Sequence, residues 1–539
     1  MKDGFRQSMA WLHTWSGISV GWVLYFIFLT GTAGYFSAEI SRWMRPELPL
    51  SSAPIDSRES VRIALARLQE DAPDADQWTI TMPDRVQEPF VRLAWHRPGV
   101  DGGAATTAVV YPGMPLGPDG ARAVERETGG GAWLYQMHYR LNYFDLNTAA
   151  WIVGFCSMCM LVSILSGVIT HKKIFSDFFT FRPRRGQRSW LDAHNALAVV
   201  ALPFHLMITY SGLVLLMITY MPLVLSATYG PEIDDQIPFF DATNPRLKEQ
   251  GPSGTPATLL AIEPLLDQAE RDGQAGSLVS IRARYAHDAN ARITVTQQYA
   301  APLRGNYQQV FDGVTGERIE TTPERTGPWW IHDLLIGLHE GRYAGPVLRW
   351  LYFLSGVIGT AMVATGLVLW TVKRRERSVA GKASRALKLV ERMNVGTIVG
   401  LPIGIAAYFL ANRLIPADLA ERGAWETHVL FIVWAATLCY AALRPVGKAW
   451  IELCSLAAAL FFALPLVNLA TTQRHLGVTI PHDHWRGEWS LAGFDLTMLG
   501  LGVLFVGLAI AVRHHVGLRL QPRPERSASL MASAAPEAE

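Results

Sequence analysis

The chain alternates between apolar stretches of about 20 residues and long polar stretches with the composition of soluble domains. A helix needs about 20 apolar residues to cross the roughly 30 Å hydrocarbon core of a bilayer. Eight stretches meet this requirement, at about 11–36, 148–170, 191–221, 347–372, 394–414, 425–443, 449–470 and 493–512. The pattern therefore predicts a polytopic α-helical membrane protein with about eight transmembrane helices.

Two long polar segments, 37–147 and 222–346, separate the first four spans. Each contains an amphipathic helical pattern, at 58–70 or 258–269, followed by runs in which apolar and polar residues alternate. The alternating runs cover 77–82, 90–96 and 106–111 in the first segment, and 278–286, 291–299 and 307–311 in the second. A period near 3.6 followed by a period of 2, with Gly-rich turns such as 312–316, predicts a small α+β domain in each segment.

The first four spans also repeat one order of residues. In each copy a histidine near the start of the first span lies 18 residues before a glycine, and a second histidine precedes a second span that also reaches a glycine. The histidines are His13, His138, His194 and His339, and the glycines are Gly31, Gly167, Gly212 and Gly366. This order predicts an internal repeat in the first four spans.

The basic residues are concentrated in short loops, which determines the expected topology. Lys and Arg cluster after the second, fourth, sixth and eighth spans, in the loops at the ends of 148–190 and 347–392, at 444–448, and after residue 512. Short loops rich in Lys and Arg remain in the cytoplasm. Both termini are therefore expected to be cytoplasmic, the four additional spans occupy 393–515, and 516–539 is expected to be a disordered tail. The net charge of +2 gives no reason to expect nucleic-acid binding.

Six histidines in or beside the spans are candidate ligands of haem iron, because a polar ring in the hydrocarbon is costly unless it is bonded. They are His13, His138, His171, His194, His205 and His339. His205 lies 11 residues after His194, nearly on the same helix face and about 16 Å farther along the axis. Interfacial anchoring and ordinary helix–helix contacts also account for single membrane histidines, and His138 and His339 could instead line a substrate mouth.

The ordered set of span, α+β domain, histidine-bearing segment, span and basic loop resembles the PepSY-associated transmembrane helix family. The resemblance is carried by 11–31, 166–168, 190–212, 312–316 and 365–370. The run 170–182 is especially similar to members that act as inner-membrane siderophore reductases. The resemblance as a whole covers about residues 5–375. The chain adds four spans, in residues 393–515, that the four-span members lack.

The resemblance implies two small PepSY-like domains on the periplasmic side of a bacterial inner membrane, and two b-type haems held by four of the six histidines. It also implies reduction of a ferric siderophore or a similar ferric chelate. The electrons would come from a quinol or from a cytoplasmic reductase, because no Gly-rich dinucleotide motif follows a strand and no cytoplasmic domain is available for NAD or flavin.

Four aromatic residues near the second histidine of each copy are candidate contacts for a bulky chelate: Trp133, Tyr139, Trp329 and Trp330. An interfacial aromatic belt is the other interpretation of these residues. Internal repeats also occur in permeases, so a transporter for iron or an iron chelate stays open as an alternative. A regulatory membrane protein whose outer domains bind a partner is the remaining alternative.

Overall fold

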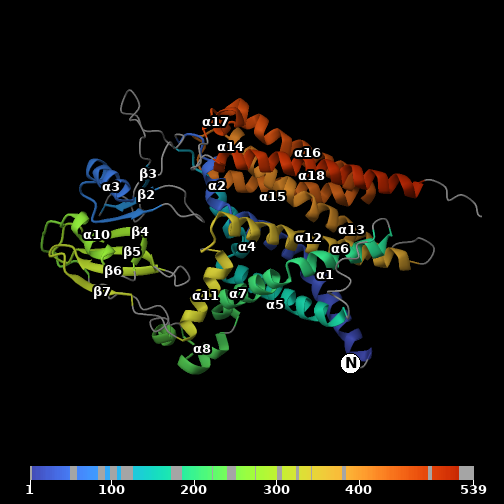
Figure 1. The fold of residues 1–539 in the computed structure, drawn as a ribbon, viewed down its shortest axis with the longest axis horizontal. Helices are drawn as coiled ribbons and strands as arrows, with labels where there is room; N and C mark the ends of the chain where they lie inside the picture. Colours follow the sequence, from blue (N-terminus) through green and yellow to red (C-terminus); the bar gives the residue numbers. More distant parts are fainter. Residues whose placement is uncertain are drawn as a thin grey trace, which may run out of the picture.

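The computed structural model describes residues 3–48, 57–82, 91–97, 106–110, 125–171, 182, 185–220, 222–232, 234–239, 251–272, 275–299, 306–322, 327–341, 343–378, 384–482 and 489–520. Figure 1 shows a long helical body with a small sheet at one end. The end of the helical body next to the sheet is here called the sheet end. The opposite end, where the N-terminus is marked, is called the basic end, after the arginines in the last turn of the helix 346–377 that ends there.

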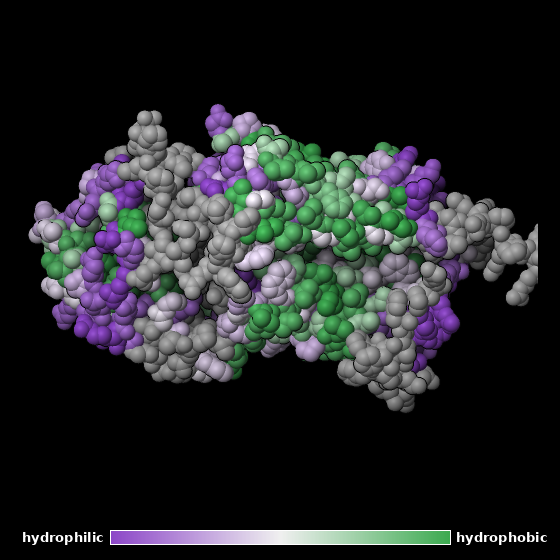
Figure 2. Space-filling model, turned by 45° about the horizontal axis from the view of Figure 1, so that its top comes forward, coloured by the Kyte–Doolittle hydropathy of each residue, from purple (hydrophilic) through white to green (hydrophobic). Residues whose placement is uncertain are grey.

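Within the described part of the chain, eight helical segments are long and apolar enough to cross a membrane, so the predicted number of spans is confirmed. They comprise α1 (Asp3–Gly34), α5 (Leu146–Thr170), α7 (Leu202–Tyr220) with α8 (Pro222–Tyr229), α12 (Pro346–Arg377), α13 (Arg385–Ile398) with α14 (Gly400–Leu414), α15 (Arg422–Leu443), α16 (Val446–Thr471) and α18 (Trp489–Leu520). On the face seen in Figure 2, hydrophobic side chains cover the middle of the helical body and hydrophilic side chains gather at its two ends. This distribution is the one that a membrane-embedded helical bundle requires.

The third predicted span, 191–221, differs from the structure because it is divided into two helices. The first is α6 (Gln187–Val200), and α7 begins at Leu202. Pro203 explains the break, because proline has no amide hydrogen and its ring clashes with the carbonyl of the preceding turn. The break separates His194 on α6 from His205 on α7.

Both polar segments contribute strands to one antiparallel sheet, whereas the sequence predicts a separate small domain in each. The sheet order is β3-β2-β1-β4-β5-β6-β7. The strands are β1 (Gln77–Thr81), β2 (Val91–His96), β3 (Thr106–Val110), β4 (Ala275–Arg284), β5 (Arg292–Tyr299), β6 (Asn306–Asp312) and β7 (Arg318–Thr321). β1 pairs with β4 at the centre, where Ile80 lies opposite Ile281 and both side chains are fully buried. An unpaired β1 or β4 would leave a row of backbone groups open, and this pairing closes both edges.

Two helices complete the core of the sheet domain. Val61 and Leu68 of α3 (Ser57–Asp71) and Leu265 of α10 (Ile262–Glu270) are buried in one cluster with Ile80 and Ile281. The predicted hairpin at 112–123 lies outside the described residues. The turn at 312–316 forms as the sequence predicts, with the Asp312 carboxylate accepting from the backbone N–H groups of the next residues and Gly316 at φ +76°.

Two short helices carry the second histidine of each predicted copy. They are α4 (Gly130–Arg140) and α11 (Pro328–Glu340), and both lie toward the sheet end in Figure 1. The chain turns after each of them, because Gly341 ends α11 in a left-handed conformation and the Asp145 carboxylate caps α5 by accepting from the Thr148 N–H at 2.9 Å. Each helix therefore runs separately from the span that follows it.

The last four spans share one apolar core with the first four. Asn394 of α13 connects the two groups, since its side chain accepts from the Trp22 indole at 2.9 Å and donates to the Leu367 carbonyl at 3.0 Å. Phe26 of α1 stacks on Trp434 of α15 with ring centroids 5.7 Å apart. Two further short helices, α2 (Ser37–Trp43) and α17 (Leu476–His482), lie at the sheet end. The C-terminal helices are thus packed against the histidine-bearing ones.

Candidate functional site

The structure brings four of the six candidate histidines together in two pairs. At the basic end, the rings of His13 (α1) and His194 (α6) have centroids 6.2 Å apart. Toward the sheet end, the rings of His138 (α4) and His339 (α11) have centroids 6.4 Å apart. We call these the inner pair and the outer pair. Each pair joins residues that are about 180 to 200 positions apart in the chain.

Each of the four rings rests on one of the four glycines. A Cβ atom added to Gly167 or Gly366 would lie 3.1 Å from the ring of His13 or His194, respectively. In the outer pair, a Cβ on Gly212 would lie 3.1 Å from the His339 ring, and one on Gly31 would lie 3.6 Å from His138. The glycines therefore leave the space that lets a helix backbone approach an imidazole closely.

The hydrogen bonds of the four rings fix their tautomers. His13 Nδ1 donates to the Ser163 carbonyl at 2.8 Å and His194 Nδ1 to the Met362 carbonyl at 3.0 Å. His138 Nδ1 donates to the carbonyl of Tyr135. A carbonyl only accepts, so each of these Nδ1 atoms carries the proton.

The fourth ring follows the same rule through a hydroxyl group. His339 Nδ1 lies 2.9 Å from the Ser211 Oγ, and that hydroxyl donates its only proton to the Met207 carbonyl at 2.6 Å. The Ser211 oxygen must therefore accept from His339. No hydrogen bond from an Nε2 atom of the four rings occurs among the described residues, so every Nε2 presents a lone pair, as a metal-binding histidine does.

The spacing within the pairs suits one metal ion between two imidazoles. Two rings that bind one ion from opposite sides at roughly 2 Å have centroids about 6 Å apart. The inner and outer pairs, at 6.2 and 6.4 Å, both meet this distance. The donor set of two neutral imidazoles is that of a six-coordinate electron-transfer haem.

A cavity of about 330 Å³ adjoins the outer pair. Its walls are mainly apolar residues of α1, α5 and α7, joined by Tyr35, Tyr139 and Glu340 near the histidines. Burial, opposed by the Tyr135 hydrogen bond, lowers the pKa of His138. Burial and the neighbouring His138 lower the pKa of His339 to about 3. Both rings are therefore neutral near pH 7, which is the form that ligates iron.

His205 and His171 stand apart from the two pairs. His205 is fully buried between them, against Phe28 and Gly359, and neither ring nitrogen makes a hydrogen bond to a described residue, although the backbone of Ser355 lies near. His171 ends α5 at the basic end, where its backbone N–H donates to the Gly167 carbonyl and its buried Nδ1 has no partner among the residues that the structure places. Neither residue meets a second histidine ring in the described part of the chain.

The four candidate aromatic residues occupy different places. Tyr139 lines the cavity beside His138. Trp133 is in the helix packing instead, because its ring stacks on Tyr408 of α14 with centroids 4.9 Å apart. Trp329 packs near Phe239, and Trp330 is 43% exposed.

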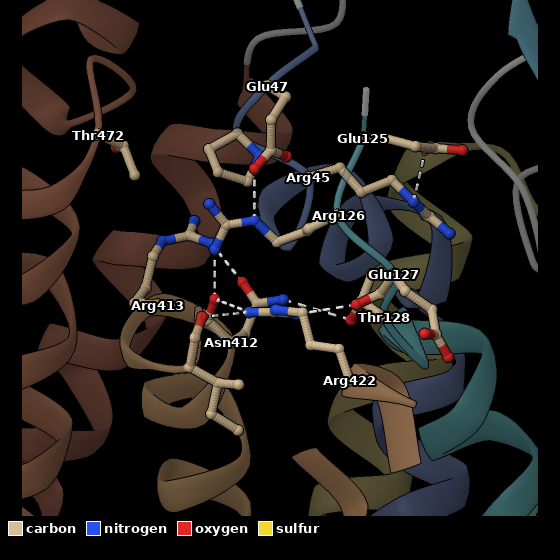
Figure 3. A network of polar contacts seen from close by, with 12 residues as sticks. Arg45, Glu47, Glu125, Arg126, Glu127, Thr128, Asn412, Arg413, Arg422 and Thr472 are labelled. Carbon is tan, nitrogen blue, oxygen red and sulfur yellow. Dashed lines mark hydrogen bonds and ion pairs between the residues drawn. The ribbon is translucent and has the colours of Figure 1, made fainter. Parts of the chain in front are cut away.

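A buried polar network, missed by the sequence reasoning, joins α14 and α15 to the segment before α4 (Figure 3). Arg422 and Glu426 of α15 are fully buried and form an ion pair. The Glu426 carboxylate also accepts from Thr128 at 2.6 Å and from Asn412 at 2.7 Å. Arg422 donates to the Glu127 carbonyl at 2.8 Å. These bonds hold the chain just ahead of α4.

The first turn of α4 is held equally closely. The Tyr408 hydroxyl donates to the Gly130 carbonyl at 2.9 Å. A Cβ on Gly131 would lie 2.1 Å from the Ser37 carbonyl oxygen, so only glycine lets α4 approach α2 there. The helix fixed in this way carries His138, which lies seven residues after Gly131.

Residues 10–373 of the 539 match the family described as the PepSY-associated TM region. The chain belongs to this family. No curated protein matches it. The matched PepSY-associated region contains all six candidate histidines and ends within α12, so α13 to α18 lie outside it.

The PepSY-associated region also carried a sequence signal for the glycine contacts. A hydroxyl residue precedes each of the four glycines, as Thr30, Ser166, Ser211 and Thr365. Their side chains all donate to carbonyls of the preceding turn. The repeated dipeptide marks the four helix positions on which a histidine ring rests.

Proposed function

We propose that this multi-pass membrane protein is a haem oxidoreductase that carries electrons from the basic end to the sheet end and there reduces a ferric chelate. The observation that carries the proposal is the presence of two histidine pairs at different depths, each with metal-ligating spacing and free Nε2 atoms. Two such pairs in one bundle suit two one-electron centres.

His13 and His194 would hold one b-type haem, and His138 and His339 would hold the other. When bound, each haem supplies a centre that alternates reversibly between Fe(III) and Fe(II). The chain keeps the four rings neutral and oriented through the carbonyls and the Ser211 hydroxyl that accept from Nδ1. His205 and His171 fall outside this ligand set, which has four of the six sequence candidates.

The basic end would face the cytoplasm of a bacterium, with both termini there and the sheet outside the inner membrane. The Lys- and Arg-rich loops support this orientation. We infer that the first four spans are a duplicated unit, because the histidines and glycines at matching offsets meet in matching contacts. Electrons would enter at the basic end from a quinol or a cytoplasmic reductase.

The substrate would be a ferric siderophore or a similar ferric chelate at the sheet end. One electron converts Fe(III) to Fe(II), which the hard oxygen ligands of a siderophore hold less tightly, so iron is released. The proposed stacking contacts for the chelate are Tyr139, which lines the cavity beside the outer pair, and Trp330 near the start of α11.

A stopped-flow experiment tests the proposal. The purified protein is reduced chemically without oxygen and mixed with a ferric siderophore in the presence of a chromogenic Fe(II) chelator. We expect the reduced haem band to decay as coloured Fe(II) complex forms, one iron for each electron. The gallium complex of the same siderophore is the control, because it has the same shape and accepts no electron. Reduced protein that keeps its spectrum in the ferric siderophore would contradict the proposal.

A further inference from the structure

Two buried side-chain nitrogen atoms at the basic end lack a hydrogen-bond partner among the residues that the structure describes. The Nδ1 atom of His171 and the indole Nε1 of Trp370 are buried, and neither forms a hydrogen bond with any residue in the described ranges. A buried N–H without an acceptor costs about 1–3 kcal/mol. Buried polar atoms left open in this way indicate a partner that the described part of the polypeptide does not supply.

These two residues occupy matching positions relative to the inner pair. His171 lies four residues after Gly167, on which the His13 ring rests, and Trp370 lies four residues after Gly366, on which the His194 ring rests. Residues four apart on a helix share one face and differ by roughly 6 Å in height. Each donor is therefore one turn from its glycine, on the side toward the basic end.

A cation completes this group. The Arg374 guanidinium lies 3.5 Å from the centroid of the Trp370 ring and 5.8 Å from that of Trp15, two residues after His13. Among the described residues, no carboxylate forms an ion pair with Arg374, whereas the next residue, Arg375, is paired with Glu391. The region thus offers the indole N–H of Trp370, the imidazole of His171, which can carry a proton on Nδ1, and one positive charge with which no described carboxylate pairs.

We propose that His171, Trp370 and Arg374 bind the two carboxylate side chains of the cofactor held by the inner pair. The inference rests on the proposed haem function and adds a recognition site for the anionic edge of that cofactor. Two carboxylates in a low-dielectric site need donors and a counter-charge, and hydrogen bonds to charged groups are the strong ones. His171 is then a donor to the cofactor and not an axial ligand of its iron.

The test compares full-length variants loaded either with haem or with haem dimethyl ester, in which both carboxylates are neutralised. Trp370→Phe removes the N–H and retains an aromatic ring, and His171→Ala removes the second donor. Trp151→Phe, on the 44% exposed tryptophan of α5, is the matched control. Haem loss to excess apomyoglobin is followed optically, and the phase of the inner site is identified as the one missing from His13→Ala.

We expect Trp370→Phe and His171→Ala each to accelerate haem loss from the inner site roughly 10- to 100-fold. This is the effect expected when one hydrogen bond to a charged group is lost. Both should keep the low-spin spectrum. With the dimethyl ester, the two variants should lose cofactor at the rate of the unaltered protein, and Trp151→Phe should match it with either cofactor.

Equal rates for the variants and the unaltered protein with haem would overturn the inference. So would an equal acceleration with the ester, which would mean that packing and not carboxylate recognition is at work. A high-spin spectrum in His171→Ala would make His171 an axial ligand and would also overturn it. Failure of the unaltered protein to bind haem at all is a different result, since it would refute the proposed function itself.

Discussion

Replacement of Gly212 by alanine separates the role of this glycine in the outer site from its role in the helix. The added Cβ would lie 3.1 Å from Cε1 of His339, closer than an ordinary carbon contact, and the 2.9 Å bond between the neighbouring Ser211 and Nδ1 holds the ring in place. Overpacking a well-packed site costs about 1–3 kcal/mol. A single methyl group should cost about 1 kcal/mol, the low end of this range, so haem affinity at the outer site should fall roughly 5-fold.

The same substitution should act in the opposite direction on the protein without haem, because a His339 ring that does not have to reach an iron can turn away from the added methyl group. Alanine is more favourable than glycine inside a helix by about 1 kcal/mol. Gly212→Ala should therefore keep or raise the melting temperature of the haem-free protein while it weakens haem binding. If haem binding weakens while the melting temperature of the haem-free protein stays the same or rises, the weaker binding cannot come from general unfolding.

Haem titration of the purified variants, monitored at the Soret band, measures the effect against two controls. Gly31→Ala places its Cβ 3.6 Å from the His138 ring, an ordinary contact, and Gly17→Ala meets nothing within 4 Å. Both should bind two haems with unchanged affinity. If Gly212→Ala binds haem as tightly as Gly31→Ala, the argument that the glycine makes room for a ligating ring is refuted.

Three further predictions concern other parts of the molecule. His205→Leu should retain both haems, and its free energy of unfolding should stay equal or rise by about 1 kcal/mol, because it removes a fully buried ring that forms no hydrogen bond with the described residues. A haem count of one would show that His205 is a ligand. Glu426→Gln should lower the free energy of unfolding by about 3–5 kcal/mol, because it leaves Arg422 as an uncompensated buried charge. Of the two haems, the one held by His138 on α4 should be released first from this variant. The partly exposed Glu452, paired with Arg444, is its control, and Glu452→Gln should cost less than about 1 kcal/mol; equal thermal shifts would contradict this. Burial raises the pKa of Asp288, but bonds from Asn290, Ser253 and Gly254 outweigh it and hold the pKa at about 2. Because the folded value lies below the unfolded value of about 4, the stabilisation is present above pH 4 and should disappear as the pH falls toward 2; the acid melting curve of Asp288→Asn should lack this component, and a curve like that of the unaltered protein would speak against it.

The number of spans and the local elements could be predicted from the sequence because both depend on short-range patterns. The strands predicted at 77–82 and 291–299 lie within one residue of β1 and β5. The joining of β1 to β4 could not be predicted, since these strands are about 200 residues apart and nothing in either run specifies its edge partner. The same limit applied to the histidines. Imidazoles in or beside the apolar spans gave six candidates, but only helix packing decides that His13 meets His194 and that His205 meets neither.

The C-terminal helices had no predicted role, because their buried polar residues gain meaning only from their partners. Glu426 and Arg422 are ordinary residues at the start of an apolar helix until Thr128 and Glu127 are brought against them. Their contacts place α14 and α15 against the first turn of the helix that carries His138. A four-span relative would have to fix this helix by other means.

The haem content of purified protein and of single His→Ala variants shows whether each histidine pair holds a haem. We expect two low-spin b-type haems per chain, and one haem after substitution of His13, His138, His194 or His339. We also expect His171→Ala and His205→Ala to be isolated from haem-replete cells with two. A colourless protein from such cells, or four paired-histidine variants that keep both haems, would contradict the account.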